Sequence, residues 1–287
     1  MKTVILPVAG KGTRLLPLTK STPKELLPVF DKPVLQFALD EARACGATRV
    51  VVVTHSSKPS IETYLASSEL QVEKLREKDK HDLADALSNA GVSSELEVRI
   101  VYQEEALGLG HAILMAAPEC LDGPIGVILP DDVILGKPAL CEMVAAYDGG
   151  HMVAAMPVSL EDVSKYGIFK TTDTNGPAIP ATGMVEKPDP ADAPSQLAAV
   201  GRYILDPVIF ETLRRIPRGA GGEYQLTDAI ATDLDRLSLT AFRYSGTRYD
   251  CGTHEGLLAG ANARREAAPQ AAQSQAQAAA PTQVAAE

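Results

Sequence analysis

Short apolar runs rich in Val and Ile alternate along the chain with segments that have helical spacing. A continuous β-branched run such as 49–54 is typical of a strand that is buried on both faces of a parallel sheet. Residues 34–44 have the spacing of a helix that ends at Gly46. Strands that alternate with helices predict a layered α/β fold. The expected strands are residues 4–8, 49–54, 99–102, 125–129, 152–158 and 200–205, and a further helix is expected over 110–117.

Two segments depart from this alternation. Charged residues crowd positions 73–85, so we interpret the surrounding stretch 61–90 as a solvent-exposed helical excursion, with a contact between subunits as the functional alternative. From residue 266 onward the chain consists mainly of Ala, Gln, Pro and Ser, with Val284 as the large apolar exception. Such a composition cannot bury enough surface to offset the entropy of ordering. We therefore expect a single domain over 1–265 and a disordered tail over 266–287.

Composition and charge narrow the kind of ligand. Of the 287 residues, 45% are hydrophobic and 5% are aromatic, which is typical of a globular protein with an aliphatic core. The formal net charge of -10 disfavours nucleic-acid binding, because an acidic surface repels the phosphate backbone. Residues 1–32 differ, since they carry six basic residues against Glu25 and Asp31. A local basic pocket in an acidic protein suits a small phosphorylated ligand.

Cysteines, histidines and apolar stretches give no sign of a zinc site, a secreted protein or a membrane span. The four cysteines and five histidines lack metal-ligand spacing, so reduced thiols are the plain interpretation. The chain begins with a strand-like run and not with a signal peptide. No apolar stretch approaches the ~20 residues that span a bilayer. We expect a cytoplasmic protein without a membrane partner.

A glycine-rich segment follows the first expected strand, and residues 9–17 read AGKGTRLLP. The dinucleotide fingerprint fails here, because Leu15 stands where its third glycine belongs. The Walker loop fails as well, because Lys11 is followed by Gly12 in place of Ser or Thr. Four prolines between residues 17 and 33 also prevent the long helix that either motif would begin.

The same segment still has the chemistry of a phosphate site. Gly10 and Gly12 let backbone N–H groups approach a polyanion without steric conflict. Arg14 offers a planar fork of donors, and Lys24 offers a mobile charge. An ordinary glycine turn would explain the glycines alone, but it would not explain the cationic side chains that share this proline-punctuated segment.

The motif resembles the signature of sugar-1-phosphate nucleotidyltransferases. The matching residues are G-x-G-T-R-L-x-P-x-T at 10–19, P-K-E-x-L-P at 23–28 and D-K-P at 31–33. Within that family, the variant T-K-x-x-P-K-E at 19–25 is most similar to the bacterial UTP–glucose-1-phosphate uridylyltransferases. The resemblance extends over roughly residues 3–263.

The resemblance implies a fold and a set of nucleotide contacts. The implied fold is a Rossmann-like three-layer α/β/α arrangement with a mixed, mostly parallel central sheet. Its mainly nucleotide-binding half would be 1–130, and its mainly sugar-phosphate half 131–265. A glutamine carries both a donor and an acceptor, so Gln103 can match the edge of uracil. The nucleotide-binding residues implied by the family are Ala9, Gly10, Gly12, Thr13, Glu25, Gln103 and Gly108.

Two aspartates are candidate metal ligands. Asp131 follows the expected strand 125–129, at the edge where α/β sheets bind ligands. Mg²⁺ prefers one or two carboxylates together with phosphates and waters. A simple turn aspartate is the alternative from this segment alone, and the neighbouring Asp132 has less support. The resemblance matches Asp131 to the metal-binding aspartate of the family and Asp250 to a second metal carboxylate, although spacing alone cannot show that they meet.

The sugar phosphate is assigned to three segments by resemblance. Gly167 matches the glycine of the sugar pocket, Glu186 and Lys187 match a Glu-Lys-Pro element, and Val200 lies in a strand that closes the pocket. Glu186 could accept hydrogen bonds from sugar hydroxyls, and Lys187 could hold a phosphate. Without the resemblance, Glu186 and Lys187 would be interpreted as a surface pair.

These assignments imply a reaction in which UTP and glucose 1-phosphate give UDP-glucose and pyrophosphate. Arg14, Lys24 and Lys187 are the expected catalytic cations, and Mg²⁺ is the expected cofactor. The sugar phosphate is itself the nucleophile, so the absence of a Ser/His or Cys/His arrangement agrees with this chemistry. A dTTP- or ATP-dependent relative and a non-catalytic regulatory homologue are the alternatives. The resemblance also suggests a homodimer or homotetramer.

Overall fold

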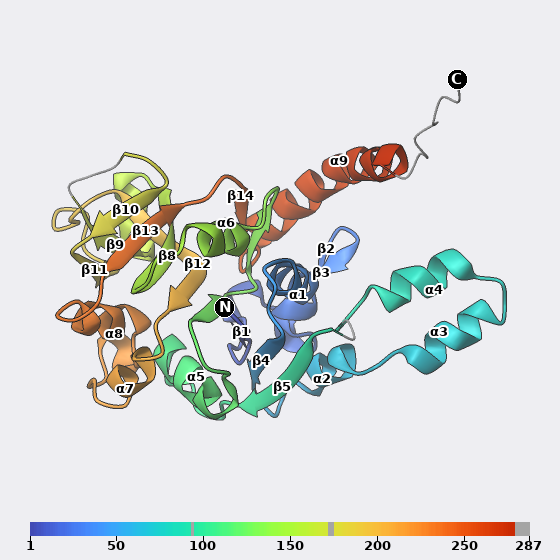
Figure 1. Cartoon of the computed structure of the whole chain (residues 1–287), viewed down its shortest axis with the longest axis horizontal. Helices are drawn as coiled ribbons and strands as arrows, with labels where there is room; N and C mark the ends of the chain where they lie inside the picture. Colours follow the sequence, from blue (N-terminus) through green and yellow to red (C-terminus); the bar gives the residue numbers. More distant parts are fainter. Residues whose placement is uncertain (93–94, 172–174, 279–287) are drawn as a thin grey trace, which may run out of the picture.

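A mixed sheet forms the centre of the molecule, and helices cover both of its faces (Figure 1). The computed structural model describes residues 1–92, 95–171 and 175–278. The strand order along the sheet is β10-β13-β8-β12-β6-β1-β4-β5, and β9 and β11 extend it beside β12. The strands are β1 (Thr3–Pro7), β4 (Arg49–Thr54), β5 (Glu97–Tyr102), β6 (Ile125–Ile128), β8 (His151–Pro157), β9 (Gly167–Lys170), β10 (Ala178–Ala181), β11 (Gly183–Glu186), β12 (Leu197–Leu205) and β13 (Leu239–Arg243).

Strand directions divide the sheet into a parallel part and a mixed part. β1 pairs in parallel with β4 and β6, and β4 pairs in parallel with β5. β12 runs antiparallel to both β6 and β8, and β8 is parallel to β13. The strands β5, β4, β1, β6, β8 and β13 therefore share one direction. The predicted fold class, a mixed and mostly parallel sheet between helical layers, is confirmed.

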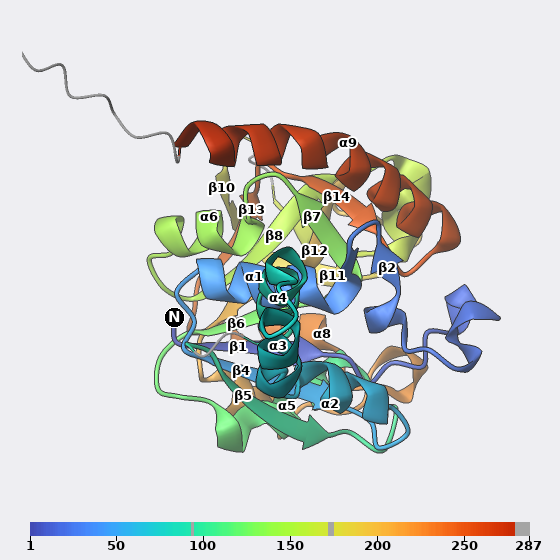
Figure 2. The ribbon, with the colours of Figure 1, turned by 90° about the vertical axis from the view of Figure 1, so that its right-hand side faces the viewer.

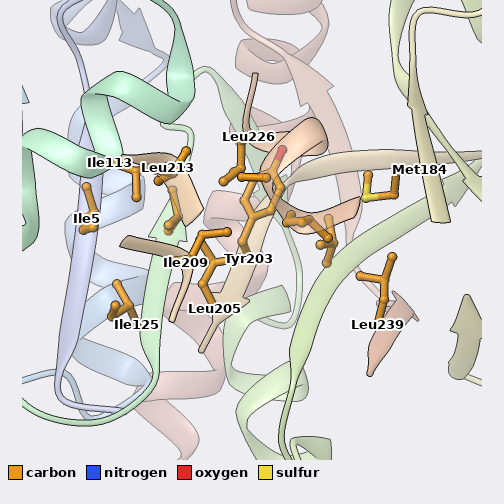
Figure 3. Close-up of a cluster of buried hydrophobic side chains, with 14 of the residues drawn as sticks. Ile5, Ile113, Ile125, Met184, Tyr203, Leu205, Ile209, Leu213, Leu226 and Leu239 are labelled. Atoms are coloured by element: carbon orange, nitrogen blue, oxygen red, sulfur yellow. The ribbon is translucent and has the colours of Figure 1, made fainter. Parts of the chain in front are cut away.

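The alternation of side chains along the central strands builds two hydrophobic cores. Ile5 and Val51 face one core, and Val4 and Val50 face the other. Because residues 4–6 and 50–53 of these strands are all apolar and buried, both faces can be covered by helices. The first core packs under α5 (Leu109–Ala116), α7 (Ile209–Leu213) and α8 (Leu226–Asp233), as Figure 3 shows in part. The second core packs under α1 (Val34–Ala44), α2 (Pro59–Leu65) and α6 (Ala139–Ala146).

A helical hairpin projects from the body of the molecule (Figures 1 and 2). It consists of α3 (Glu69–Arg76) and α4 (His81–Ser88), which pack on each other. Only Val72 and Ala84 are buried within the two helices, whereas Leu70 and Leu83 are exposed. This hairpin matches the solvent-exposed excursion expected from the charge pattern.

The last part of the chain folds back across the beginning. β14 (Thr247–Asp250) pairs antiparallel with β7 (Asp132–Leu135), and α9 (His254–Ala278) packs on β14 and on β2 (Pro28–Val29). Arg264 of α9 donates two hydrogen bonds of 2.9 Å to Asp31, next to β3 (Lys32–Pro33). The remaining elements are short 3-10 helices: η1 (Thr13–Leu15), η2 (Leu18–Lys20), η3 (Lys24–Leu26), η4 (Ala117–Glu119), η5 (Leu160–Lys165) and η6 (Ala220–Gly222).

The C-terminal segment differs from the expectation. We expected no ordered structure over 266–287, but α9 continues to Ala278, and residues 279–287 lie outside the described residues. Composition shows that such a segment cannot form a core, but Ala and Gln favour helix and can extend one that is already nucleated. Across the described residues, no helix combines the length and apolarity that crossing a membrane requires.

Candidate active site

Two adjoining cavities open at the carboxyl ends of the parallel strands, where α/β sheets bind ligands. The smaller cavity, about 350 Å³, is lined by the segments that follow β1, β4 and β5. The larger cavity, about 580 Å³, is lined mainly by the second half of the chain. The residues common to both linings are Leu109, Leu129, Asp131 and Glu223. Asp131, two residues past Leu129 at the end of β6, therefore stands at the junction of the two cavities.

The glycine-rich segment turns sharply after β1 instead of starting a long helix, as its prolines predicted. Gly12 adopts a left-handed backbone conformation with φ of 64° and caps η1. A Cβ atom there would lie 3.1 Å from Thr19 Cγ2, so glycine is needed for both conformation and space. Ala9 and Gly10 line the smaller cavity. Gly12 and Thr13 do not line it, so their contribution in this structure is to shape the turn.

A buried lysine that sequence reasoning missed holds this segment in place. Lys58 precedes α2, and its Nζ donates to the carbonyl oxygens of Val8 at 2.6 Å and Gly10 at 2.5 Å. It also forms an ion pair with Glu25 Oε2 at 3.0 Å. Burial lowers the pKa of Lys58 and raises that of Glu25, although each charge opposes the shift of the other. A single lysine in a loop carries no motif, so no local pattern marked it.

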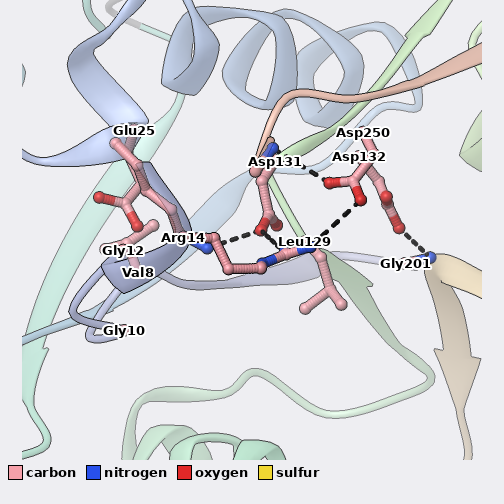
Figure 4. A network of polar contacts seen from close by, with 12 residues as sticks. Val8, Gly10, Gly12, Arg14, Glu25, Leu129, Asp131, Asp132, Gly201 and Asp250 are labelled. Atoms are coloured by element: carbon pink, nitrogen blue, oxygen red, sulfur yellow. Dashed lines mark hydrogen bonds and ion pairs between the residues drawn. The ribbon is translucent and has the colours of Figure 1, made fainter. Parts of the chain in front are cut away.

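Two cations and two carboxylates meet at the junction of the cavities (Figure 4). Lys24 Nζ lies 2.6 Å from Asp131 Oδ2, and Arg14 lies 3.3 Å from Asp250 and 4.0 Å from Asp131. Burial acts to raise the pKa of Asp131, but Lys24 and Arg14 outweigh it and hold that pKa below its ordinary value. Burial acts to lower the pKa of Lys24, and Asp131 outweighs it. Lys24 and Asp131 are thus both charged at neutral pH.

The space between the two carboxylates is kept open by a glycine. A Cβ atom on Gly252 would lie 3.0 Å from both Asp131 Oδ2 and Asp250 Oδ1, and 2.6 Å from Arg14 Nη2. Any side chain at this position would fill the point where the carboxylates converge. Asp250 reaches this point because β14 pairs with β7 in a register that sets Asp250 opposite Asp132. The structure thus brings together the two aspartates that sequence spacing could not connect.

The neighbouring Asp132 serves a different purpose. It is buried, and its Oδ2 accepts the backbone N–H of Gly201 at 2.8 Å, while its Oδ1 accepts from Arg248 Nε at 2.7 Å. Arg202, only 1% exposed, donates to the Asp132 carbonyl oxygen and pairs with Glu41 at 2.9 Å. Asp132 therefore joins β7 to β12 and β14 beside the larger cavity, whereas Asp131 lines both cavities.

Gln103 lines the smaller cavity and lies just after β5. Its Nε2 contacts the carbonyl oxygen of Gly108 at 3.2 Å and Nδ1 of His111 at 2.9 Å. Burial lowers the pKa of His111, so the imidazole is neutral and its Nδ1 can accept this bond. Gly108 has φ of 92°, and a Cβ atom there would lie 2.7 Å from Glu223 Cβ. His111, at the start of α5, thus orients Gln103.

Antiparallel pairing assembles the larger cavity. β9 and β11 are in a register that sets Gly167 opposite Glu186. Glu186 Oε2 accepts a hydrogen bond from Thr227 at 3.2 Å, and Oε1 lies 3.2 Å from Lys187 Nζ. The Lys187 side chain is 59% exposed. The Lys187 backbone has φ of 46°, a conformation that is uncommon for a residue other than glycine. The structure therefore brings these predicted sugar residues together at one wall.

The placement of Val200 corrects the sequence-based assignment. Val200 is 2% exposed and packs in the core beneath α1 and α6, so its side chain does not reach the cavity. Its neighbours Ala199 and Gly201 line the cavity instead, because successive side chains of a strand point to opposite faces. Sequence reasoning chose the correct strand but the wrong face. It also missed Arg248, which comes from a segment with no recognisable local pattern.

This fold and site define a class of enzyme that handles nucleotides. The chain belongs to the nucleotidyl transferase family, whose model matches residues 2–267.

Relatives place the chain more narrowly within that family. It is 40% identical over 262 residues to the UTP–glucose-1-phosphate uridylyltransferase YngB of Bacillus subtilis, covering 90% of this chain and 87% of the relative. A crystal structure of UDP-glucose pyrophosphorylase complexed with UDP-glucose is 37% identical, with a TM-score of 0.79 and coverage of 93% and 99%. The UTP-bound UGPase from Acinetobacter baumannii is 36% identical, with a TM-score of 0.83 and coverage of 91% and 92%.

Proposed function

We propose that the chain joins UTP to glucose 1-phosphate, forming UDP-glucose and releasing pyrophosphate. The observation that carries this proposal is the meeting of two cavities at Asp131, where Lys24, Arg14 and Asp250 also converge. A reaction between two phosphorylated substrates needs two adjacent sites whose phosphates meet at a positively charged junction. The names of the relatives, which include UTP–glucose-1-phosphate uridylyltransferases, support the choice of substrates.

The smaller cavity would hold UTP. Its lining combines Ala9 and Gly10 of the glycine-rich segment, which suit a triphosphate, with Gln103, which suits a base. Because Gln103 Nε2 is engaged by Gly108 and His111, Oε1 is the atom that would accept the imide N–H of uracil.

The larger cavity would hold glucose 1-phosphate. Glu186 is fixed by Thr227 and would accept hydrogen bonds from sugar hydroxyls, while Gly167 leaves room beside it. Lys187 at the exposed rim would attract the phosphate. The smaller cavity carries Lys24 and the larger carries Arg14, so the two substrates would face each other across one pair of cations.

The residues at the junction fit Mg²⁺, which the nucleotidyltransferase family typically uses. Asp131 and Asp250 converge on the space left by Gly252, and Mg²⁺ commonly takes one or two carboxylates together with phosphates and water. Within the described residues, no group of three or more His, Cys, Asp or Glu side chains surrounds a common point. When bound, the ion would supply positive charge to the phosphates. In the structure, Lys24 and Arg14 form ion pairs with these carboxylates.

The chemistry then needs charge and alignment more than proton transfer. The phosphate of the sugar is largely dianionic at neutral pH, because its second pKa is near ~6, so its oxygen can attack the α-phosphorus of UTP directly. Lys24 and Arg14 would stabilise the departing pyrophosphate, and Lys187 would guide the incoming phosphate. Lys58 would hold the carbonyl oxygens of Val8 and Gly10 away from the triphosphate, leaving backbone N–H groups to face it.

The proposal is tested by measuring pyrophosphate release. Purified protein is mixed with Mg²⁺, glucose 1-phosphate and each nucleoside triphosphate in turn. We expect release with UTP that EDTA abolishes. Release mainly with dTTP or ATP would assign the protein to the alternative substrate, and folded protein that binds UTP without releasing pyrophosphate would indicate a regulatory homologue. The cytoplasmic location and the homo-oligomer stay predictions.

A further inference from the structure

Two cysteines that are distant in sequence face each other across two packed helices. Cys45 ends α1, and Cys141 lies in the first turn of α6. Their Sγ atoms are 2.6 Å apart. The helices are fixed at this point, because Glu41 of α1 accepts the backbone N–H of Leu140 at 2.8 Å. The contact between the two sulfur atoms is therefore part of a rigid helix–helix interface.

The other two cysteines provide an internal comparison. Cys120 donates to the carbonyl oxygen of Ala116 within its own segment at 3.3 Å, and Cys251 is fully buried in the core beneath α9. Burial raises the pKa of each of these thiols to about 12, so both are protonated and unreactive at neutral pH. Only Cys45 and Cys141 form a pair.

The environment of the pair gives its members different roles. Cys141 lies in the first turn of α6, where the helix dipole favours negative charge, while burial, Glu41 and Glu142 disfavour it. The contact with Cys45 lowers the pKa of Cys141, whereas the contact with Cys141 and burial raise the pKa of Cys45. Cys141 is thus the member of the pair that loses its proton first.

We propose that Cys45 and Cys141 form a dithiol site that low-molecular-weight disulfides oxidise to an intramolecular disulfide linking α1 to α6. The Cys141 thiolate attacks one sulfur of the small disulfide, which breaks its S–S bond and releases one thiolate. Cys45 then loses its proton and attacks Cys141 Sγ, and the second small thiolate leaves. One small disulfide is reduced to two thiols while the protein dithiol is oxidised. Reduction by excess small thiol reverses both exchanges.

This bond would stabilise the fold without contributing to the reaction. It would close a loop between positions 96 residues apart, and cross-links over long loops restrict the unfolded chain most strongly. It would also lie beside Glu41, which pairs with the buried Arg202 behind the active site. We expect the oxidised protein to have a melting temperature several degrees higher than the reduced protein.

The experiment equilibrates the full chain with oxidised and reduced glutathione at a series of ratios, followed by acid quenching, alkylation and mass spectrometry. We expect a loss of about two mass units per chain, two alkylated cysteines in place of four, and a peptide that links Cys45 to Cys141. Dithiothreitol should restore four alkylated cysteines. Cys120→Ser is the matched control and should oxidise like the unmodified chain, whereas Cys45→Ser should form no linked peptide.

Three results would overturn the proposal. One is that Cys45 and Cys141 stay alkylatable at every glutathione ratio. Another is a stable adduct that retains glutathione on Cys141. The third is a linked peptide whose formation leaves the melting temperature unchanged. None of these readouts depends on turnover, so failure of the proposed uridylyltransferase activity would leave the result interpretable.

Discussion

The two cavities are built in different ways, although they share Asp131. The smaller cavity, which we propose holds UTP and call the nucleotide cavity, is lined mainly by segments that each follow a parallel strand, and the buried Lys58 binds the carbonyl oxygens of its glycine-rich segment. The larger cavity, which we propose holds glucose 1-phosphate and call the sugar cavity, is formed largely by side chains from antiparallel strands. Its Lys187 is exposed at the rim. The nucleotide cavity thus depends on backbone conformation and on a buried charge. The sugar cavity depends on side chains, among them one exposed lysine.

Removing the buried charge should have the largest effect. In Lys58→Met, Glu25 remains buried and unpaired, and Val8 and Gly10 lose a donor. Breaking a buried ion pair in this way typically costs ~3–5 kcal/mol. Urea unfolding should show this loss, and KM for UTP should rise more than KM for glucose 1-phosphate.

The double variant Lys58→Met with Glu25→Gln tests the physical reason for that loss. Because it removes the unpaired charge, it should recover part of the stability lost in Lys58→Met. A double variant that is less stable by the sum of both single effects would show that the ion pair is not the cause.

A substitution at Asp131, which lines both cavities, should slow the reaction itself. Asp131→Asn should lower kcat by about 100- to 1,000-fold, comparable to the ~2.7–4 kcal/mol that a lost oxyanion donor costs. Steady-state pyrophosphate release measures it. Asp132→Asn is the adjacent comparison, and because Asp132 is buried against Arg248, it should reduce stability first. Near-normal turnover in Asp131→Asn would remove this residue from the mechanism.

The exposed lysine of the sugar cavity should give a smaller and more selective effect. Charge-assisted hydrogen bonds are worth ~1.5–3 kcal/mol, so Lys187→Ala should lower kcat/KM for glucose 1-phosphate by about 10- to 100-fold. KM for UTP should change little. Lys165→Ala is the matched control, because Lys165 lines the same cavity but pairs with Asp162 at 2.6 Å. Equal effects of the two substitutions would contradict a specific role for Lys187.

The smallest effect should be the change of stability with pH. It should arise at His151, in the half of the chain that forms the sugar cavity. His151 is fully buried, contacts Asp233 at 3.1 Å, and accepts the backbone N–H of Asp206 at 3.3 Å. Burial lowers its pKa below the ordinary value of 6.5, although Asp233 opposes this. Near and below pH 6.5 the unfolded chain therefore binds more protons at His151 than the folded chain does. The stability that the neutral imidazole contributes is complete above pH 6.5 and declines as the pH falls.

Urea unfolding between pH 8 and pH 5.5 measures this decline. The fall in the free energy of unfolding should be smaller in His151→Gln, whatever the absolute stability of the variant. An identical pH dependence in both proteins would show that other groups are responsible.

The sequence by itself determined the parallel core and the nucleotide half of the site. Runs such as 50–53 are apolar at every position, so they have to be buried on both faces, and the glycines, prolines and cations of residues 9–33 lie close together in the chain. The position of Asp131 followed from the same logic, because the residue after a buried strand lies at its carboxyl end. These are local relationships, and spacing along the chain expresses them directly.

Only the tertiary structure decided which distant segments meet. The register of β14 against β7 brings Asp250 to Asp131, and the register of β11 against β9 sets Glu186 beside Gly167. The face of β12 put Val200 in the core instead of the cavity. Lys58, Arg248 and the contact between Cys45 and Cys141 carry no local signal. Pairing register and long-range contacts depend on how the whole chain packs, because no single segment contains the energy that selects them.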